Sequence, residues 1–104
     1  MKTNKHICAV LSLALGFVAC SASAQEKLTP ASLTAASCAA CHNTQGRSVE
    51  GTPVIAGIPR EQFITAFKEF QSGARKATVM HRHAKGYNDQ EIELLADYFS
   101  AQKR

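Results

Sequence analysis

The pentapeptide CAACH places two cysteines three residues apart, with a histidine directly after the second: Cys38, Cys41 and His42. This motif constrains the fold more than any other feature, because residues 25–104 contain no other cysteine. A cluster of this kind binds a metal, cycles a disulfide or attaches a haem. Each of these alternatives makes a different demand on the rest of the chain.

The first 24 residues are predicted to be a secretory signal peptide. Lys2 and Lys5 give a basic start, residues 7–18 are almost all apolar, and Ala-Ser-Ala at 22–24 matches a signal peptidase site. The apolar run is shorter than the roughly 20 residues of a membrane-spanning helix. We therefore expect cleavage after Ala24, export to the periplasm and no membrane span. The sequence FVAC, ending at Cys20, loosely resembles a lipoprotein site but is the poorer match.

Removing 24 residues from 104 leaves residues 25–104, one domain of 80 residues. A chain this short buries little apolar surface and usually needs a disulfide, a metal or a cofactor. A disulfide between Cys38 and Cys41 would close too small a loop to stabilise the fold. With Lys2 and Lys5 set aside, 10 basic and 8 acidic residues remain, too even a balance for nucleic-acid binding.

The patterning predicts an all-α fold with three main helices, because no segment alternates like a strand. The first helix is capped by Thr29, begins at Pro30 and runs to about Cys41. The second follows Pro59 and ends at Gly73. The third follows a capping box and ends near the C-terminus. The expected apolar stripes are Leu33, Ala36 and Ala40; then Phe63, Ile64, Phe67 and Phe70; then Ile92, Leu95, Ala96 and Phe99, after the box of Asn88 and Glu91.

Residues 46–59 and 74–87 are predicted to be long loops. The first contains three glycines and two prolines, and the second is basic and contains Met80. Long loops in a compact domain are usually functional. We expect these two to enclose a large apolar group.

A covalent haem accounts for the whole motif better than zinc or a redox dithiol. A zinc site could be written with Cys38, Cys41, His81 and His83, but HxH is not the spacing of a zinc finger. A redox CxxC precedes a helix beside a strand, whereas this one ends a predicted helix. Cysteines at i and i+3 lie on one turn, where both sulfurs reach the vinyl groups of one haem. His42 then follows as the ligand of the iron.

The sixth iron position has three candidate arrangements. Met80 is favoured, since it is the only methionine besides Met1, and a thioether ligand raises the reduction potential. His81 or His83 would instead give a low-potential bis-histidine site. An open position that binds small ligands is the third arrangement.

Two further residues are candidates for contacts around the haem. The Pro53 carbonyl is placed to accept a hydrogen bond from the outer ring nitrogen of His42, which would fix the orientation of the ligand. Arg47 is a candidate partner of a haem propionate.

Three segments resemble class I c-type cytochromes, in particular the monohaem cytochrome subunits of flavocytochrome c sulfide dehydrogenase. They are CAACHNTQGRSV, PVIAGIPREQFITAFKEFQSGARKATVM and AKGYNDQEIELLADYFSAQ. The resemblance implies one haem c held by Cys38 and Cys41, with His42 and Met80 as iron ligands. It also implies that the first and last helices cross at Tyr98 and Phe99.

The resemblance further implies an electron-transfer protein rather than an enzyme. A flavoprotein partner that oxidises sulfide would be the electron donor. The alternatives are a free carrier that serves a terminal oxidase or reductase, and a ligand-binding haem sensor. A basic group in the second loop, made of Arg75, Lys76, Arg82 and Lys85, is the expected surface for an acidic redox partner.

Overall fold

The computed structural model describes residues 27–104, and within this range all regular structure is helical. The predicted signal peptide, with Cys8 and Cys20, lies outside the described residues. The expectation of an all-α fold is thus met for this part of the chain. The elements are α1 (Pro30–Ala35), η1 (Ala36–Cys38), α2 (Ala39–His42), α3 (Arg60–Ser72), α4 (Met80–His83), η2 (Ala84–Gly86) and α5 (Asp89–Ser100).

The first helical run ends at the CxxCH motif, close to the predicted position. Thr29 and Ser32 form a reciprocal capping box, and Pro30 occupies the first turn. The predicted apolar stripe is wrong: Leu33 is 60% exposed, and the buried residue of α1 is Ala35. Ala36 and Ala40 are exposed together with Leu33, so the predicted stripe lies on one face of the run, and that face is not the one packed against the core.

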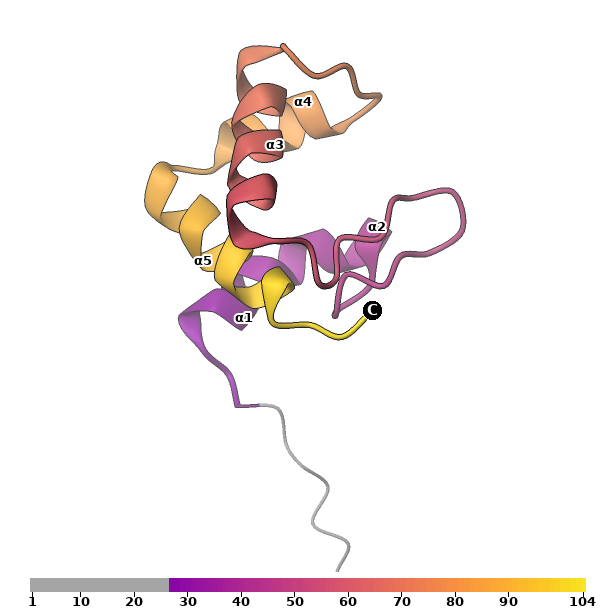
Figure 1. Cartoon of the computed structure of the whole chain (residues 1–104), viewed down its shortest axis with the longest axis vertical. Helices are drawn as coiled ribbons and strands as arrows, with labels where there is room; N and C mark the ends of the chain where they lie inside the picture. The colour runs from indigo at the N-terminus through magenta and orange to yellow at the C-terminus, as the bar shows by residue number, and fades with distance from the viewer. Residues whose placement is uncertain (1–26) are drawn as a thin grey trace, which may run out of the picture.

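Helix α5 is the centre of the fold, with α1 and α3 packed against it (Figure 1). The predicted buried stripe of α5 is confirmed, because Ile92, Leu95, Ala96 and Phe99 are all fully buried. In α3, Phe63 and Phe67 are buried as predicted, whereas Ile64 and Phe70 are only partly buried. Gly73 ends α3 in the left-handed conformation that favours glycine.

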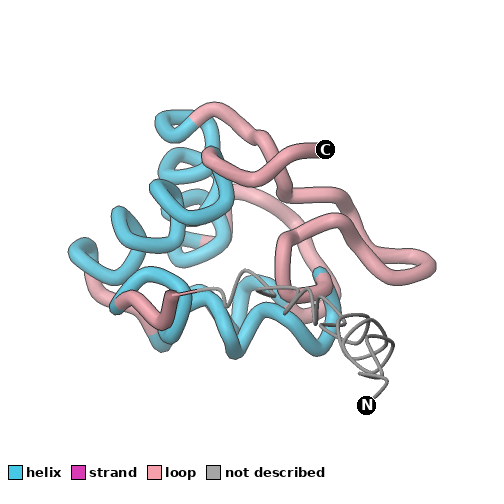
Figure 2. Tube along the Cα trace, turned by 90° about the horizontal axis from the view of Figure 1, so that it is seen from below, coloured by secondary structure: helices cyan, strands magenta, loops and turns pink. Residues whose placement is uncertain are grey.

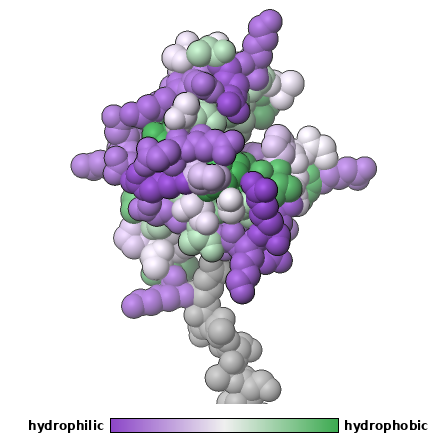
Figure 3. Space-filling model, in the orientation of Figure 1, coloured by the Kyte–Doolittle hydropathy of each residue, from purple (hydrophilic) through white to green (hydrophobic). Residues whose placement is uncertain are grey.

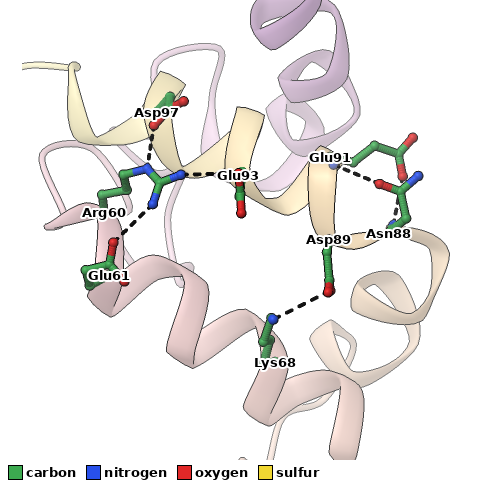
Figure 4. A network of polar contacts seen from close by, with 8 residues as sticks. All are labelled: Arg60, Glu61, Lys68, Asn88, Asp89, Glu91, Glu93 and Asp97. Atoms are coloured by element: carbon green, nitrogen blue, oxygen red, sulfur yellow. Dashed lines mark hydrogen bonds and ion pairs between the residues drawn. The ribbon is translucent and has the colours of Figure 1, made fainter.

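Aromatic rings join α3 to α5. The Phe63 ring stacks on Phe67 at 5.5 Å and on Phe99 at 5.7 Å, measured between ring centroids. On the surface, Arg60 of α3 reaches Asp97 at 2.7 Å and Glu93 at 3.5 Å on α5 (Figure 4). Burial of aromatic area dominates the energetics of such a contact, and exposed ion pairs add little.

The predicted second loop contains short helices, which corrects the expectation of an irregular segment over residues 74–87. Helix α4 begins at Met80 and continues into η2, which ends at Gly86. No side chain caps α4. Its position depends instead on the buried Ala84 and on packing against α3, neither of which has a local sequence signal.

Figure 2 shows the helices gathered on one side of the molecule and the long loop after α2 extending on the other. The C-terminal residues run back beside this loop: Arg104 Nε donates to the Ala56 carbonyl at 3.2 Å. Within residues 27–104, no helix is long and apolar enough to cross a membrane.

Candidate haem-binding site

The CxxCH motif occupies the last turn and a half of the first helical run. Cys38 ends η1 and is partly buried, whereas Cys41 lies in α2 and is exposed. Neither cysteine forms a disulfide. His42 ends α2 with only 8% of its surface exposed, so its imidazole is held inside the fold. The three side chains lie within five residues of one short helical segment.

The imidazole of His42 is oriented by the backbone of a loop residue. Its Nδ1 lies 2.8 Å from the carbonyl oxygen of Pro53. A carbonyl only accepts, so Nδ1 carries the proton and Nε2 keeps a lone pair for a metal. The hydrogen bond anticipated from the sequence is therefore present, while its role in orienting an iron ligand stays a prediction.

The loop over residues 43–58, called here the His42 loop, is held by hydrogen bonds that return to the motif. Ser48 N–H donates to the His42 carbonyl at 2.8 Å, and Thr52 Oγ1 donates to the Cys41 carbonyl at 2.6 Å. Thr52 immediately precedes Pro53, so its hydrogen bond to Cys41 holds the Pro53 carbonyl opposite the His42 imidazole. Neither Ser48 nor Thr52 was singled out from the sequence, because hydroxyl contacts of this kind are too common to signal a site.

Gly46 closes the His42 loop against the core. Its carbonyl accepts from the N–H groups of Ile55 at 2.8 Å and Ala56 at 2.9 Å. Its φ of 73° lies in the left-handed region. A Cβ there would lie 2.7 Å from Ile55 Cγ1 and 2.8 Å from Phe99 Cδ1. Only glycine fits, and the tight closure brings Pro53 back over α2.

Met80, the candidate distal ligand, begins α4 and packs partly buried against the core. Of the competing histidines, His81 places Nδ1 3.0 Å from the Ala77 carbonyl, and His83 is exposed. In Figure 1, α4 lies beside the C-terminal end of α3, and α2 with the His42 loop lies toward its N-terminal end. The two candidate iron ligands thus come from segments at opposite ends of α3.

Apolar side chains remain exposed next to both ligand segments. Val54 follows Pro53 and is 46% exposed, and Val79 precedes Met80 and is 48% exposed. Figure 3 shows apolar surface midway along the visible face, with hydrophilic surface above and below it. Exposed valines beside a buried imidazole and two thiols suit a flat, largely apolar prosthetic group.

The surroundings of Cys38 include a residue that sequence reasoning missed. Tyr87, which precedes α5, forms a hydrogen bond through its hydroxyl with the Oγ of Ser37, the neighbour of Cys38. Burial raises the pKa of the Cys38 thiol, and hydrogen bonds to Ser37 and Tyr87 partly offset that increase.

Arg47 lies on the surface at the edge of the His42 loop. Its Nε donates to the Lys103 carbonyl at 3.3 Å, which links the loop to the C-terminal residues. Among the described residues, the Nη atoms of Arg47 have no hydrogen-bond or ion-pair partner. Pairing of Arg47 with a propionate stays a prediction.

The residues present fit a haem better than the alternatives. No three His, Cys, Asp or Glu side chains of residues 27–104 come together as metal ligands, so the proposed zinc set is not assembled. The CxxC pair ends a helix and adjoins no strand in this range. Helices packed around a CxxCH motif, with a carbonyl-bound imidazole and an available thioether, define a small protein of the covalent-haem class.

Comparison with known proteins agrees with this class. The sequence pattern of the cytochrome c family matches residues 31–103, so the chain belongs to the cytochrome c family. It is 51% identical over 63 residues to the cytochrome subunit of sulfide dehydrogenase from Chlorobaculum tepidum, covering 61% of this chain and 57% of that protein. It is 37% identical over 71 residues to the thiosulfate dehydrogenase electron acceptor of Thiomonas intermedia, covering 66% and 33% respectively. A cytochrome c-553 from Desulfomicrobium norvegicum is 31% identical over 64 residues, covering 59% and 80%.

Family membership confirms the class I cytochrome fold and its electron-transfer function. It also identifies the bound group as haem c, attached covalently. The chain spans 57% of the sulfide dehydrogenase subunit and 33% of the thiosulfate dehydrogenase acceptor. The electron donor and the full assembly of those relatives therefore enter below as proposals.

Proposed function

We propose that residues 25–104 form a periplasmic monohaem cytochrome that accepts electrons from a dehydrogenase. The single CxxCH motif supports one haem, and the predicted signal peptide supports export. The observation that carries the proposal is the buried His42, whose Nδ1 is bound by the Pro53 carbonyl at 2.8 Å beside two reduced thiols. That arrangement leaves Nε2 as an iron ligand and both sulfurs for attachment.

In this proposal each residue of the site has one task. Cys38 and Cys41 attach the porphyrin through thioether bonds, and His42 binds the iron on one face. Met80 would supply a sulfur ligand, which would favour the ferrous state and raise the potential. Haem c supplies an iron centre that gains and loses one electron. With His42 and Met80 both bound, the iron would have no position left for a substrate, which suits electron transfer.

Mass spectrometry tests the attachment. The intact mass of the exported protein should equal that of residues 25–104 plus one haem, and acid–acetone should not extract the pigment. Variants Cys38→Ala and Cys41→Ala should each retain one thioether bond. A colourless protein, or a pigment that dissolves into acid–acetone, would contradict the attachment through sulfur.

The distal assignment has a separate spectroscopic test. The ferric protein should show the weak long-wavelength sulfur-to-iron absorption band, and Met80→Ala should abolish it. His81→Ala and His83→Ala are the matched controls and should retain the band. A band that survives Met80→Ala would show that Met80 is not the ligand.

We further propose a flavoprotein that oxidises reduced sulfur compounds as the electron donor. The support is the likeness to relatives named for sulfide dehydrogenase and thiosulfate dehydrogenase. The cytochrome c-553 relative, covered over 80% of its length, favours instead a free carrier to an oxidase or reductase. Affinity capture from the native periplasm, followed by sulfide-dependent reduction of the haem in the captured fraction, separates the two. Reduction only by an unrelated donor would support the free carrier.

The proposed partner surface is basic but less so than its sequence indicates. Arg75, Lys76, Arg82 and Lys85 are all exposed. However, Arg75 Nε pairs with Glu69 at 2.8 Å, and its guanidinium lies 5.5 Å from the centre of the Phe70 ring. The three remaining cations should dominate docking, so Lys85→Glu should slow reduction by the partner at low salt. Lys103→Glu, outside this group, is the charge-matched control.

A further inference from the structure

Helix α4 is too short to hold its own position. It has four residues and no side-chain cap, and such a helix is not stable without tertiary support. Met80 is its first residue, so the direction of the thioether depends on whatever fixes α4. Residues 76–87, called here the Met80 segment, must therefore be anchored by other elements.

Gln71 of α3 provides one anchor. Its Nε2 donates to the carbonyl of Ala84 and to the carbonyl of Tyr87, each at 2.9 Å. Ala84 is fully buried, and its own N–H donates to the Met80 carbonyl. A single side chain thus joins α3 to both ends of η2 and, through one more hydrogen bond, to the backbone of Met80.

Tyr87 provides the second anchor. Its hydroxyl forms a hydrogen bond with Ser37 Oγ, on the segment that carries Cys38. Its ring meets Phe67 edge to face, with centroids 5.6 Å apart and planes at 89°. Tyr87 therefore connects the end of the Met80 segment to the CxxCH helix and to the core together.

Other hydrogen bonds of the Met80 segment are internal. His81 contacts the Ala77 carbonyl, the N–H groups of Arg82 and His83 donate to Val79, and Tyr87 N–H donates to Ala84. Among the described residues, the hydrogen bonds that join the Met80 segment to α3 come from Gln71, and those that join it to the CxxCH helix link the Tyr87 hydroxyl to Ser37 and Cys38. Two side chains thus carry the polar attachment of this segment to the rest of the fold.

We propose that Gln71 and Tyr87 are positioning residues that keep Met80 in place as the distal ligand. The inference rests on the proposed function, in which Met80 binds the iron. Without either anchor, the Met80 segment moves away from the core more often, and the sixth iron position opens more often. Gln71 acts through the backbone carbonyls of Ala84 and Tyr87, and Tyr87 acts by holding the end of the segment.

Carbon monoxide is the probe for this opening, because it binds ferrous iron only after the distal ligand has left. Gln71→Met keeps the volume and removes both hydrogen bonds, so we expect carbon monoxide to bind about tenfold faster. Tyr87→Phe removes one hydrogen bond and should give about a threefold increase. The matched controls are Gln62→Met, at an exposed position of α3, and Tyr98→Phe, whose hydroxyl donates to the Thr44 carbonyl of the His42 loop. Both controls should leave the rate unchanged.

A double-mutant cycle shows whether the Tyr87 effect comes from this contact. Ser37→Ala removes the same hydrogen bond from the other side, so Ser37→Ala combined with Tyr87→Phe should bind carbon monoxide no faster than either single variant. Additive effects, or rates equal to those of the controls, would overturn the proposal for Tyr87. Unchanged binding in Gln71→Met would overturn it for Gln71. Should Gln71→Met fail to incorporate haem, Gln71→Glu, which keeps the shape and loses the donor, replaces it.

The wild-type protein separates failure of this inference from failure of the proposed function. If wild type lacks the sulfur-to-iron band, or binds carbon monoxide as fast as Met80→Ala, the assignment of Met80 is wrong. If wild type shows the band and resists carbon monoxide, while the anchor variants match their controls, Met80 remains the ligand and the anchoring role is wrong.

Discussion

The His42 loop and the Met80 segment are similar in length but are held in different ways. The His42 loop returns hydrogen bonds to Cys41 and His42, closes on itself at Gly46, and donates from Gly57 N–H to the Phe99 carbonyl at 2.8 Å. The Met80 segment bonds mainly to itself and reaches other elements through Gln71 and Tyr87. His42 is therefore held by backbone hydrogen bonds within the fold, whereas the segment that carries Met80 depends on a few side-chain contacts.

This difference indicates that the region around His42 is more stable than the Met80 segment. His42, the proposed proximal ligand, lies where backbone hydrogen bonds and buried rings come together. Met80, the proposed distal ligand, lies in a segment held by fewer contacts, so this segment should open at a lower free-energy cost than global unfolding. Amino-acid changes in the two regions should therefore differ in size and in what they affect.

Removing a buried aromatic ring beside the His42 loop should give the largest loss of stability. Phe99 is fully buried and stacks on Phe63, and its carbonyl holds Gly57. Phe99→Ala should lower the free energy of unfolding by about 3–5 kcal/mol. Phe70→Ala, at the partly buried end of α3 near the Met80 segment, should cost about 2 kcal/mol. Chemical denaturation of the haem-loaded protein measures both, and equal losses would remove the contrast between the regions.

The closure of the His42 loop should be nearly as sensitive. Gly46→Ala combines a left-handed φ with a Cβ 2.7 Å from Ile55 Cγ1, so we expect a loss of about 3 kcal/mol. Gly51 also has a positive φ, of 84°, but an added Cβ would meet nothing within 4 Å. Gly51→Ala should therefore cost only about 1 kcal/mol, for the backbone alone. Similar losses in the two variants would mean that the tight packing at Gly46 does not contribute to the free energy of unfolding.

Sequence signals predicted those parts of the fold that depend on neighbouring residues. The caps at Thr29 and Asn88, the glycine end at Gly73 and the buried stripe of α5 each follow from residues within one or two turns. Helix α4 was missed because its anchor, Gln71, lies 13 residues from Ala84 in the chain. The stripe at Leu33 was misplaced because the packing of α1 against α5, which decides the buried face, has no local sequence signal.

The residues of the candidate site also fall into two groups, those that the sequence predicted and those that it did not. The CxxCH motif and the Pro53 carbonyl were predictable because a haem ligand needs a hydrogen-bond acceptor behind its imidazole. The roles of Ser48, Thr52 and Tyr87 were not, because each depends on a fold contact with no fixed spacing. Ser37 and Tyr87, for example, are 50 residues apart. Polar residues that position a site through the backbone leave little trace in a single sequence.

The capping box of α5 lies where the Met80 segment joins the core. Asn88 Oδ1 accepts from Glu91 N–H at 2.9 Å, and Glu91 Oε2 accepts from Asn88 N–H at 2.9 Å (Figure 4). Asn88→Ala should lower the free energy of unfolding by about 1 kcal/mol, because the Glu91 N–H loses its partner. Gln90→Ala, an exposed change in the same turn, is the control and should be nearly neutral. Thermal unfolding detects the difference, and a neutral Asn88→Ala would show that the cap is dispensable once α5 is packed.

The surface ion pairs of α3 should give the smallest effect and extend the comparison to the two ends of this helix. Arg60 contacts Asp97, Glu61 and Glu93, and the Asp97 contact contributes most to raising the pKa of the guanidinium. At the other end, Lys68 makes a single contact with Asp89 at 3.6 Å. Arg60→Gln should lower the Tm slightly at low salt, and Lys68→Gln should lower it less, because one exposed contact is replaced by water. In about 1 M salt, where screening acts within about 3 Å, both differences should vanish. A decrease for Arg60→Gln that persists in salt would mean that its aliphatic stem, rather than its charge, joins α3 to α5.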